Sequence, residues 1–442
     1  MTPHSASDAT KSATLLAPGV RPREVWSWAM YDFANSGYTT VVITAVFNAY
    51  FVSEVAGGAT WATFAWTSAL GLSYALIILT APIVGAYADA RAAKKKLLAI
   101  TTVGCIGFTA ALALVGPGDL WLAFALIVAS NFFFGTGENL VAAFLPEIAR
   151  EDAMGRISGW GWSLGYLGGL VSLGFCLAYV TWAQAHALPP THYVAVSMLI
   201  TAVLFAAASV PTFAYLRERA RPVSDARNAV KRSFEHLADT LRHAFRYRDL
   251  ARFLVCIVFY QAGVQAVIAL AAIYAQQALG FTTAQTIALV LVVNVTAAAG
   301  AFAFGYVQDR LGHVRTIELT LVGWLAAIAL AWAAQGPVLF WIAANLVGLS
   351  LGSSQSAGRA LVGYLSPPAR NAEFFGLWGL AVKFSAILGP LTYGAAAWLS
   401  GGDHRLALLL LAVYFVVGII IVRGINVERG RASALAGTPP AS

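Results

Sequence analysis

Charged residues are scarce in this chain, and their scarcity decides its class. Only 11% of its 442 residues are Asp, Glu, Lys or Arg, whereas 59% are hydrophobic, and the mean hydropathy is +0.72. Soluble domains carry about a quarter charged residues, so a soluble globular domain is excluded. The apolar residues cluster into stretches of about 20, the length that crosses a hydrocarbon core about 30 Å thick. These stretches predict an all-α polytopic membrane protein with twelve transmembrane helices, at about residues 28–52, 63–88, 97–115, 120–145, 158–182, 193–216, 253–277, 284–307, 316–334, 337–361, 374–399 and 405–422.

Cysteine is also rare, and several catalytic motifs are missing. Cys105, Cys176 and Cys256 lie inside apolar stretches without the spacing of metal ligands, which argues against a disulfide framework or a zinc site. The chain has no Gly-x-x-x-x-Gly-Lys-Ser/Thr sequence, so we expect it not to hydrolyse ATP. It has no His-Glu-x-x-His cluster either, which disfavours a membrane-embedded enzyme. We therefore expect no metal, no cofactor and no enzymatic activity.

The basic residues follow a strict pattern along the chain. All of the 28 Lys and Arg residues except Lys383 and Arg405 fall in the termini or in every second connection. Because Lys and Arg accumulate in cytoplasmic loops, both termini are predicted to be cytoplasmic, in a multi-pass protein of the cell (inner) membrane. The net charge of +8 then reflects topology and attraction to anionic lipid, and we expect no nucleic-acid partner. The first 20 residues lack a charged segment followed by an apolar one, so no cleaved signal peptide is expected.

The chain divides around its longest connection. We predict a disordered cytoplasmic tail at residues 1–24, a six-helix bundle at 25–216, a cytoplasmic linker at 217–250, a second six-helix bundle at 251–424 and a cytoplasmic tail at 425–442, disordered from Gly430. In the linker, Phe234, Leu237, Leu241 and Phe245 recur at helical spacing among basic residues. That pattern fits a helix lying in the membrane interface, or a solvated linker helix, which we favour. We expect the protein to be a monomer.

A short pattern occurs twice at the same place in each half. Gly85 and Asp89 recur as Gly305 and Asp309, 220 positions later. Such a repeat indicates two parallel six-helix units, a build found in secondary transporters. The Gly permits close backbone approach, and the Asp can accept N–H groups at the start of the next helix. We expect cytoplasmic gate or hinge residues in these two loops and in the regions around Arg150 and Arg370. The candidates are Gly85, Asp89, Arg91, Glu147, Arg156, Gly305, Asp309, Arg310, Arg315 and Glu373.

These loops resemble the signature Gly-x-x-x-Asp-(Arg)-x-Gly-x-x-Arg of the major facilitator superfamily. A narrower resemblance is to its autophagy-related vacuolar effluxer branch, also called the unknown-major-facilitator family. It is carried by Trp28-Ala-Met-Tyr-Asp-Phe-Ala-Asn-Ser-Gly-Tyr38, Leu145-Pro-Glu-Ile-Ala149, the segment 156–169, Ala372-Glu-Phe-Phe-Gly-Leu-Trp378 with Lys383, and Leu388-Gly-Pro390. Fungal members are associated with export of amino acids from the vacuole, whereas most bacterial members have no assigned substrate. The compact loops are similar to the bacterial type.

Polar residues inside the predicted spans are the candidate substrate contacts, since such residues are costly in a membrane. Asp32, Asn35, Ser36 and Thr39 share one helical face, as do Asn131 and Glu138. The resemblance implies that spans one, four, seven and ten line a central cavity. The candidates are Asp32, Asn35, Ser36, Asn131, Glu138, Gln261, Gln265, Asn345, Gln355, Arg359 and Lys383. Asn35 and Gln355 have a second interpretation, as hydrogen-bond partners between helices.

Two ionisable residues lie deep in their predicted spans. Glu138 is about 12 Å and Lys383 about 13 Å from the inner ends, at 1.5 Å per residue. We hypothesise that they bind the two ends of a zwitterion or form a pair that breaks as the halves rock, and that Glu138 or Asp32 carries a coupled proton. The alternatives are a fixed structural pair and, for Asp32, a shallow cap.

The function predicted from these features is secondary active transport of a small polar or zwitterionic solute, amino-acid-like and exported, by alternating access. Its partners would be the solute, membrane lipid and protons. The alternatives are an uncoupled facilitator and a non-transporting membrane sensor on a transporter fold.

Overall fold

The computed structural model describes residues 15–150, 153–219, 245–367 and 371–436, with five positions between 235 and 242. Within this part of the chain the extended elements are helices, and the only strand-like pairing is an isolated bridge between Leu16 and Ala149. Twelve helices, counted over the described residues, are long and apolar enough to cross a membrane. The predicted fold class, an all-α protein with twelve spans, is confirmed.

The described residues form two compact units. Unit 1 takes its residues from Met1–Ile43, Leu79–Val115 and Trp121–Ser233, and unit 2 from Thr44–Ile78, Gly116–Leu120 and Phe234–Ser442. The unit boundary therefore cuts through the first two spans, which the predicted division at 25–216 and 251–424 left whole. The reason is packing, since residues 44–78 make their contacts with helices late in the sequence. The predicted division at 25–216 and 251–424 remains a proposal that concerns duplication of the sequence and not the packing units.

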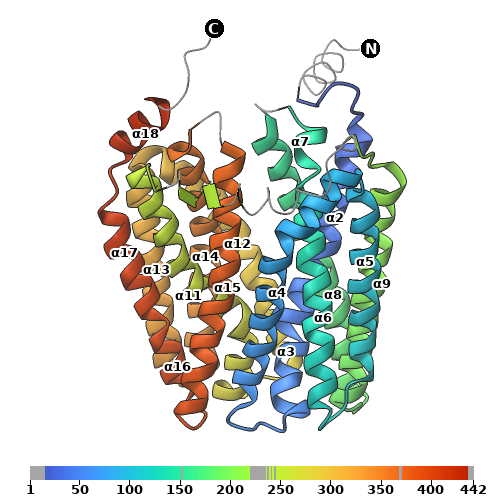
Figure 1. Cartoon of the computed structure of the whole chain (residues 1–442). Helices are drawn as coiled ribbons and strands as arrows, with labels where there is room; N and C mark the ends of the chain where they lie inside the picture. Colours follow the sequence, from blue (N-terminus) through green and yellow to red (C-terminus); the bar gives the residue numbers. More distant parts are fainter. Residues whose placement is uncertain are drawn as a thin grey trace, which may run out of the picture. The chain divides into compact units, whose positions relative to one another are not determined.

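Unit 1 is built from long helices that run side by side in Figure 1. Among these, α2 packs against α8 and α9, and α5 packs against α9. The elements are α2 (Pro22–Tyr38), the π-helical segment η1 (Thr39–Ala45) as far as Ile43, the last part of α4 (Ala62–Arg91), α5 (Lys94–Ala111), η3 (Leu112–Leu114), α6 (Leu120–Ala142), α7 (Leu145–Ile148), α8 (Met154–Ala185) and α9 (Pro190–Tyr215).

Unit 2 contains the second half of the chain and the segment Thr44–Ile78, which joins the first two spans. Its principal packed pairs are α12 with α14, α11 with α15 and α13 with α14. The elements are α3 (Phe47–Tyr50), the π-helical segment η2 (Phe51–Val55), the first part of α4, α11 (Arg248–Leu279), α12 (Thr283–Leu311), α13 (His313–Ala333), α14 (Pro337–Leu365), α15 (Asn371–Leu399), α16 (His404–Leu410), α17 (Ala412–Arg423) and α18 (Val427–Ala436).

One glycine contact in each unit sets how closely two helices approach. In unit 1, a Cβ on Gly168 of α8 would collide with the carbonyl oxygen of Phe33 on α2. In unit 2, a Cβ on Gly389 of α15 would collide with the carbonyl oxygen of Ala262 on α11. Small residues at such crossings let helix backbones pack directly in a membrane, where apolar side chains gain little by leaving lipid. Gly168 and Gly389 are therefore packing residues.

Two segments expected to be disordered are ordered where the structure describes them. Residues 15–20 run beside the end of α7, with the Ala17 amide donating to Ile148 O at 3.1 Å and Leu16 buried. Helix α18 forms over Val427–Ala436 and buries Gly430 against Leu365 and Asp249. Composition alone disfavoured order in both, but a few tertiary contacts supply it. Residues 1–14 and 437–442 lie outside the described residues.

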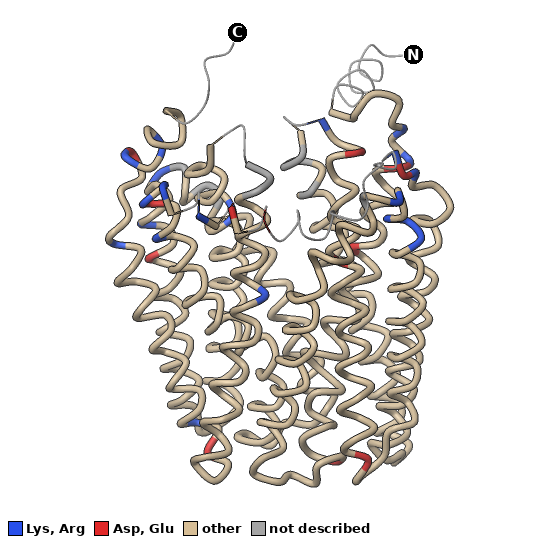
Figure 2. Tube along the Cα trace, in the orientation of Figure 1, with Lys and Arg blue, Asp and Glu red and all other residues tan. Residues whose placement is uncertain are grey.

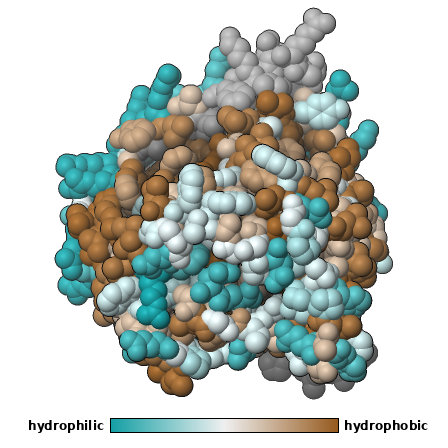
Figure 3. All heavy atoms as spheres, turned by 90° about the horizontal axis from the view of Figure 1, so that it is seen from below, coloured by the Kyte–Doolittle hydropathy of each residue, from teal (hydrophilic) through white to brown (hydrophobic). Residues whose placement is uncertain are grey.

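Most of the charged residues lie at the helix ends, and a few lie within the spans (Figure 2). Figure 2 shows Lys and Arg gathered at the ends of unit 1 that carry the start of α5, and at the ends of unit 2 that carry α18. The helix ends seen from below in Figure 3 carry hydrophilic side chains among hydrophobic ones. Arg405, at the start of α16, donates to the carbonyl oxygens of Trp332 and Ala334 at the end of α13, at 3.2 and 2.7 Å. This basic residue therefore caps a helix carboxyl end.

Candidate functional site

In unit 1, aromatic side chains fasten one side of helix α2 to its neighbours. The Trp28 indole N–H donates to Val141 O on α6 at 2.8 Å. The Tyr31 hydroxyl lies 2.8 Å from the Thr102 hydroxyl on α5, and the Tyr38 hydroxyl lies 2.9 Å from the Ser130 hydroxyl on α6. Three aromatic residues of the motif that carried the family resemblance thus fix the position of α2 against α5 and α6. We had not assigned these aromatic residues a role, because their partners are about 70 to 110 positions away in sequence.

The polar side of α2 lies against the glycines of α8. A Cβ on Gly161 would meet the Asp32 carboxylate, and one on Gly165 would come within 2.9 Å of the Ser36 hydroxyl oxygen. The predicted shared face of Asp32 and Ser36 is present. Thr39, the fourth member of that face, starts the π-helical segment η1, so the α-helical spacing used to place it ends at Tyr38.

Two carboxylates of unit 1 act electrostatically on the same phenol. Asp32 on α2 and Glu138 on α6 both act electrostatically on Tyr31, whose hydroxyl sits where a Cβ on Gly137 would be only 2.8 Å away. Glu138 is exposed and Asp32 half-buried, and both take part in interactions within the protein. The proton-coupling candidates therefore share one neighbourhood, within the span segments 22–55 and 120–148.

Asparagine side chains complete the polar set of unit 1. Asn35 is 7% exposed, and its side-chain oxygen accepts no hydrogen bond from the described part of the chain. A buried acceptor left unsatisfied costs about 1–3 kcal/mol, so a water or a solute group is the natural partner. Asn131 is fully buried on α6 and interacts within the protein. The Asn35 side-chain oxygen is thus a candidate to accept a hydrogen bond from a bound molecule.

In unit 2, two of the candidate residues bond to each other. The Gln261 amide on α11 donates to the Gln355 side-chain oxygen at 2.9 Å, and Gln355 donates back at 3.4 Å. The second interpretation of Gln355, as a partner between helices, describes this arrangement. Asn345 donates to Trp341 O of its own helix at 2.8 Å. Gln265 is half-buried on α11.

Cationic side chains lie close to that amide pair. The Arg359 guanidinium on α14 stacks over the Trp378 ring of α15, 5.3 Å from its centroid, and Arg359 and Lys383 each interact within the protein. Neighbouring Gly358 packs on the Tyr260 hydroxyl, beside Gln261. The Ser385 hydroxyl donates to Val258 O at 2.9 Å, which brings the Lys383 region of α15 to the same level of α11. Unit 2 therefore carries Arg359 and Lys383 on helices that pack against α11, the helix of Gln261.

The gate residues of unit 1 belong to a network of ion pairs. Lys94 pairs with Glu147 at 3.0 Å, and the other Glu147 oxygen accepts the Arg219 backbone N–H at 2.6 Å. The Arg219 guanidinium donates to both oxygens of Glu24, at 3.1 and 2.9 Å, and Glu218 accepts the backbone N–H groups of Lys94 and Lys95. Glu147, one of the predicted gate residues, thus bonds to Lys94 and Arg219.

Several other gate candidates occupy helix ends. Gly85 has open space where a Cβ would be, Arg91 stacks over Tyr87 at 5.7 Å, and Arg310 and Arg315 are exposed at the α12–α13 turn. Gly312 in that turn has φ +82°, a conformation that favours glycine. Five candidates and Arg370 have side chains outside the described residues, namely Asp89, Arg156, Gly305, Asp309 and Glu373.

The first span changes unit within a π-helical stretch. Unit 1 ends at Ile43 and unit 2 begins at Thr44, inside η1, and the helix breaks again at Val46 (φ −118°, ψ −65°). Beyond the break, the Asn48 amide donates to Ala269 O on α11 at 3.1 Å, and Phe64 of α4 stacks on Trp398 of α15 at 5.2 Å. π-helical turns often mark functional sites. The break was not predicted from the sequence, because the segment is mostly apolar. The isolated polar residue Asn48 could have indicated it.

Two other chemistries find little support among the described residues. Gly161-Trp-Ser163-Leu-Gly165 has the Gly-x-Ser-x-Gly spacing of a hydrolase nucleophile. It lies within α8, however, where the Ser163 hydroxyl donates to Gly159 O at 2.9 Å, so it lacks the strand-to-helix turn that such a nucleophile requires. The residues that the structure describes also include no group of three or more His, Cys, Asp or Glu able to hold a metal ion.

Comparison with known proteins agrees with this architecture. Residues 54–435 match the family described as "Vacuole effluxer Atg22 like". The uncharacterized MFS-type transporter YxiO of Bacillus subtilis is 30% identical over 403 residues, which are 90% of this chain and 93% of that protein. Autophagy-related protein 22 of Candida glabrata is 27% identical over 220 residues, 47% of this chain and 40% of that protein. The nucleoside transporter NupG has a similar structure, with a TM-score of 0.67 at 15% identity over 92% of this chain and 99% of that one.

Proposed function

We propose that this chain, which belongs to the Atg22-like vacuole effluxer family and is a multi-pass membrane transporter of the major facilitator type, moves a small polar or zwitterionic solute by secondary active transport. The observation that carries the proposal is the presence of ionisable side chains of opposite sign inside the membrane spans. Unit 1 holds Asp32 and Glu138 around Tyr31, and unit 2 holds Arg359 and Lys383. Such groups in a span are functional sites by default.

The chemistry of these groups supports an amino-acid-like solute. Carboxylates such as Asp32 and Glu138 attract ammonium groups, and cations such as Arg359 and Lys383 attract carboxylates, which are the two charged groups of a zwitterion. Asn35 supplies an acceptor that the described part of the chain leaves open. Fungal relatives are named autophagy-related protein 22, and the family description is of vacuole effluxers, which supports export as the direction.

Proton coupling is the second part of the proposal. A carboxylic acid in a span can exist in a charged and a neutral form at modest cost, so Glu138 or Asp32 can take up a proton in one conformation and release it in another. The conformational change is assigned to the two helices that pass from one unit to the other. The π-helical η1 lies at the crossing in the first span, and Pro82 lies four residues past the crossing in α4. Both features weaken the regular helical hydrogen bonds.

The orientation and location follow from the distribution of charge. Because the basic residues gather at the helix ends near α5 and α18 (Figure 2), those ends are proposed to face the cytoplasm, with both termini there. The B. subtilis relative supports the cell membrane as the location. We keep a monomer as the proposed functional form.

The test is uptake of a radiolabelled mixture of the protein amino acids into vesicles that contain the purified protein. We expect accumulation driven by an imposed proton gradient and abolished by a protonophore. Glu138→Gln should lose the response to the gradient, whereas Glu54→Gln, the same change at the end of the first span, should keep it. Flux that ignores the gradient in wild-type vesicles would make the protein an uncoupled facilitator, and specific binding without flux would make it a sensor.

A further inference from the structure

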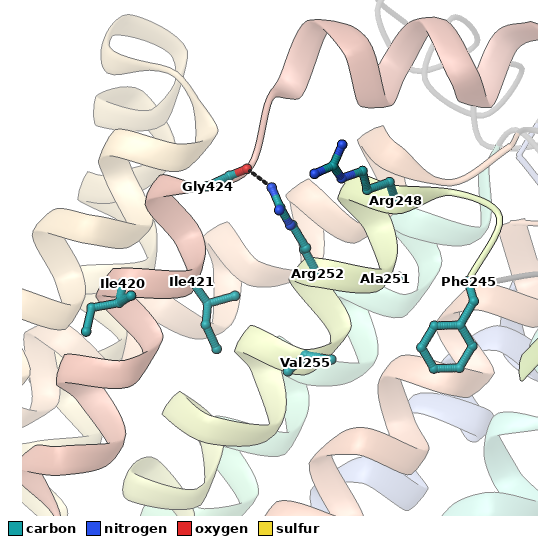
Figure 4. Close-up of a pocket in the computed structure, with 8 residues that line it drawn as sticks. All are labelled: Phe245, Arg248, Ala251, Arg252, Val255, Ile420, Ile421 and Gly424. Carbon is teal, nitrogen blue, oxygen red and sulfur yellow. Dashed lines mark hydrogen bonds between the residues drawn. The ribbon is translucent and has the colours of Figure 1, made fainter.

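A groove opens on the outer surface of unit 2 between the start of α11 and the end of α17. It encloses about 530 Å³. Its upper part is formed by Arg248 and Arg252, and its lower part by Val255, Ile420 and Ile421, with Phe245 at one side (Figure 4). Arg248, Arg252 and Val255 are spaced i, i+4, i+7 and therefore share a face of α11. One wall thus changes from charged to aliphatic along a single helix.

Neither guanidinium group is neutralised by an ion pair within the described residues, although Arg252 acts electrostatically on Asp249. Arg252 donates to Gly424 O, just past the end of α17, at 2.6 Å, which fixes the side chain across the top of the groove and leaves other N–H donors available. Among the described residues, neither Arg252 nor Arg248 forms an ion pair with a carboxylate. The nearest acidic group, Asp249, is 2% exposed and bonds to Arg429 and to the Asn426 backbone N–H. Glu318 is taken up by Arg423.

The aliphatic part of the groove is built for contact with lipid chains. Val255 is 43% and Ile420 66% exposed, and both lie within membrane spans, where an exposed aliphatic side chain meets hydrocarbon. At 1.5 Å per residue, Val255 lies about 4.5 Å deeper along α11 than Arg252. Phe245, 71% exposed, sits just before α11, a position where aromatic rings favour the headgroup region. The cationic side chains and then the aliphatic side chains follow one another along the groove, as the phosphate and the acyl chains do along a phospholipid.

We infer that this groove is a binding site for one anionic phospholipid of the leaflet on the basic side of the membrane. Its phosphate is held by Arg248 and Arg252, and one acyl chain runs along Val255 and Ile420. The fork of N–H donors on each Arg suits phosphate oxygens, and two unneutralised cations select a lipid with net negative charge over a zwitterionic one. The lipid bridges α11 and α17 at the end where Arg252 already joins them. The inference rests on the geometry of unit 2 alone and is independent of the transported solute.

Native mass spectrometry of the full-length protein tests the site, after delipidation and titration with phosphatidylglycerol or phosphatidylcholine. We expect wild-type protein to retain one phosphatidylglycerol preferentially, and Arg248→Gln/Arg252→Gln to bind it about 30-fold more weakly, the effect of losing two membrane-surface cations. Arg310→Gln/Arg315→Gln removes the same charge at exposed positions of the same unit and should bind like wild type.

A second double variant distinguishes loss of lipid binding from loss of folding. Arg248→Lys/Arg252→Lys keeps both charges but not the planar forks, and it should bind phosphatidylglycerol more weakly than wild type and more tightly than the Gln variant. Equal retention of phosphatidylcholine and phosphatidylglycerol by wild type, or equal weakening by the control pair, would overturn the site.

Discussion

The basic ends of the two units use their positive charge differently. In unit 1, Lys94 and Arg219 are paired with Glu147 and Glu24, and Glu218 covers the start of α5. In unit 2, the buried Asp249 is taken by Arg429 of α18, while Arg248 and Arg252 make no ion pair within the described residues. The Lys and Arg residues of the helix ends therefore tie helices together in both units, and in unit 2 two of them also line a cationic groove.

Deep in the spans, by contrast, both units use a glycine to bring two helix backbones into contact. Substitution of these glycines should reduce stability more than any other change proposed here. Gly168→Ala in unit 1 and Gly389→Ala in unit 2 each place a methyl group against a backbone carbonyl, which cannot move aside like a side-chain end. Each substitution is expected to destabilise the protein by about 3 kcal/mol, measured as thermal unfolding of the purified protein in detergent. If one unit tolerated its substitution, the parallel between the units would fail.

Matched controls for the glycine substitutions lie in the same helices. Gly174→Ala in α8 and Gly376→Ala in α15 introduce a methyl group where no neighbouring atom lies within 4 Å. These variants should unfold at or slightly above the wild-type temperature, because alanine favours a helix by about 1 kcal/mol over glycine.

Substitutions that break the ion pairs at the helix ends should reduce stability to an intermediate degree. The segment that is loosened should differ between the two units. Asp249→Asn removes the charge that holds Arg429, whose own pKa is raised by its hydrogen bonds to Asp249, and it should free α18. Glu24→Gln, also at a buried acid, 3% exposed, weakens the tie to Arg219 instead. Each is expected to cost about 1–3 kcal/mol.

Limited trypsin digestion tells these two variants apart. Asp249→Asn should accelerate cleavage after Arg429 and Arg431, and Glu24→Gln should leave cleavage there at the wild-type rate. Equal cleavage of the two variants would mean that the Asp249 pair does not hold α18.

The smallest effects should come from single hydrogen bonds inside the spans. A double-mutant cycle on Gln261→Ala and Gln355→Ala in unit 2 is expected to give a coupling energy of about 0.6 kcal/mol, as is usual for hydrogen bonds between membrane helices. Tyr38→Phe with Ser130→Ala in unit 1 should give a similar value. A coupling of zero in unit 2 would imply that Gln261 and Gln355 act independently, as separate solute contacts.

Local pattern was enough to place the spans and the candidate polar residues. Apolar runs and the alternation of Lys and Arg are properties of neighbouring residues, and the twelve spans were confirmed. Helical spacing also placed Asp32 and Ser36 on the side of α2 that meets the glycines of α8. Interpretation was less secure where one residue type fits two roles, as with Gln355, whose bond to Gln261 spans 94 positions.

Features that depend on distant contacts were not predictable from pattern. Nothing local separates residues 44–78, which pack in unit 2, from the rest of the first two spans. Helix α18 has a polar sequence that composition assigns to a disordered tail, and its order depends on Asp249, some 180 positions earlier. The pair of Glu147 with Lys94 also joins residues far apart in sequence, 53 positions from each other.

The central claim is that charges within the spans bind a transported solute, and counterflow measures this most directly. Vesicles containing wild-type, Lys383→Ala or Lys96→Ala protein would be preloaded with unlabelled amino acids and then exposed to the radiolabelled mixture. Lys96 is an exposed lysine at the start of α5 and serves as the matched control. The account predicts transient accumulation by wild type and Lys96→Ala, and at least a tenfold loss for a folded Lys383→Ala. Full counterflow by Lys383→Ala would contradict it.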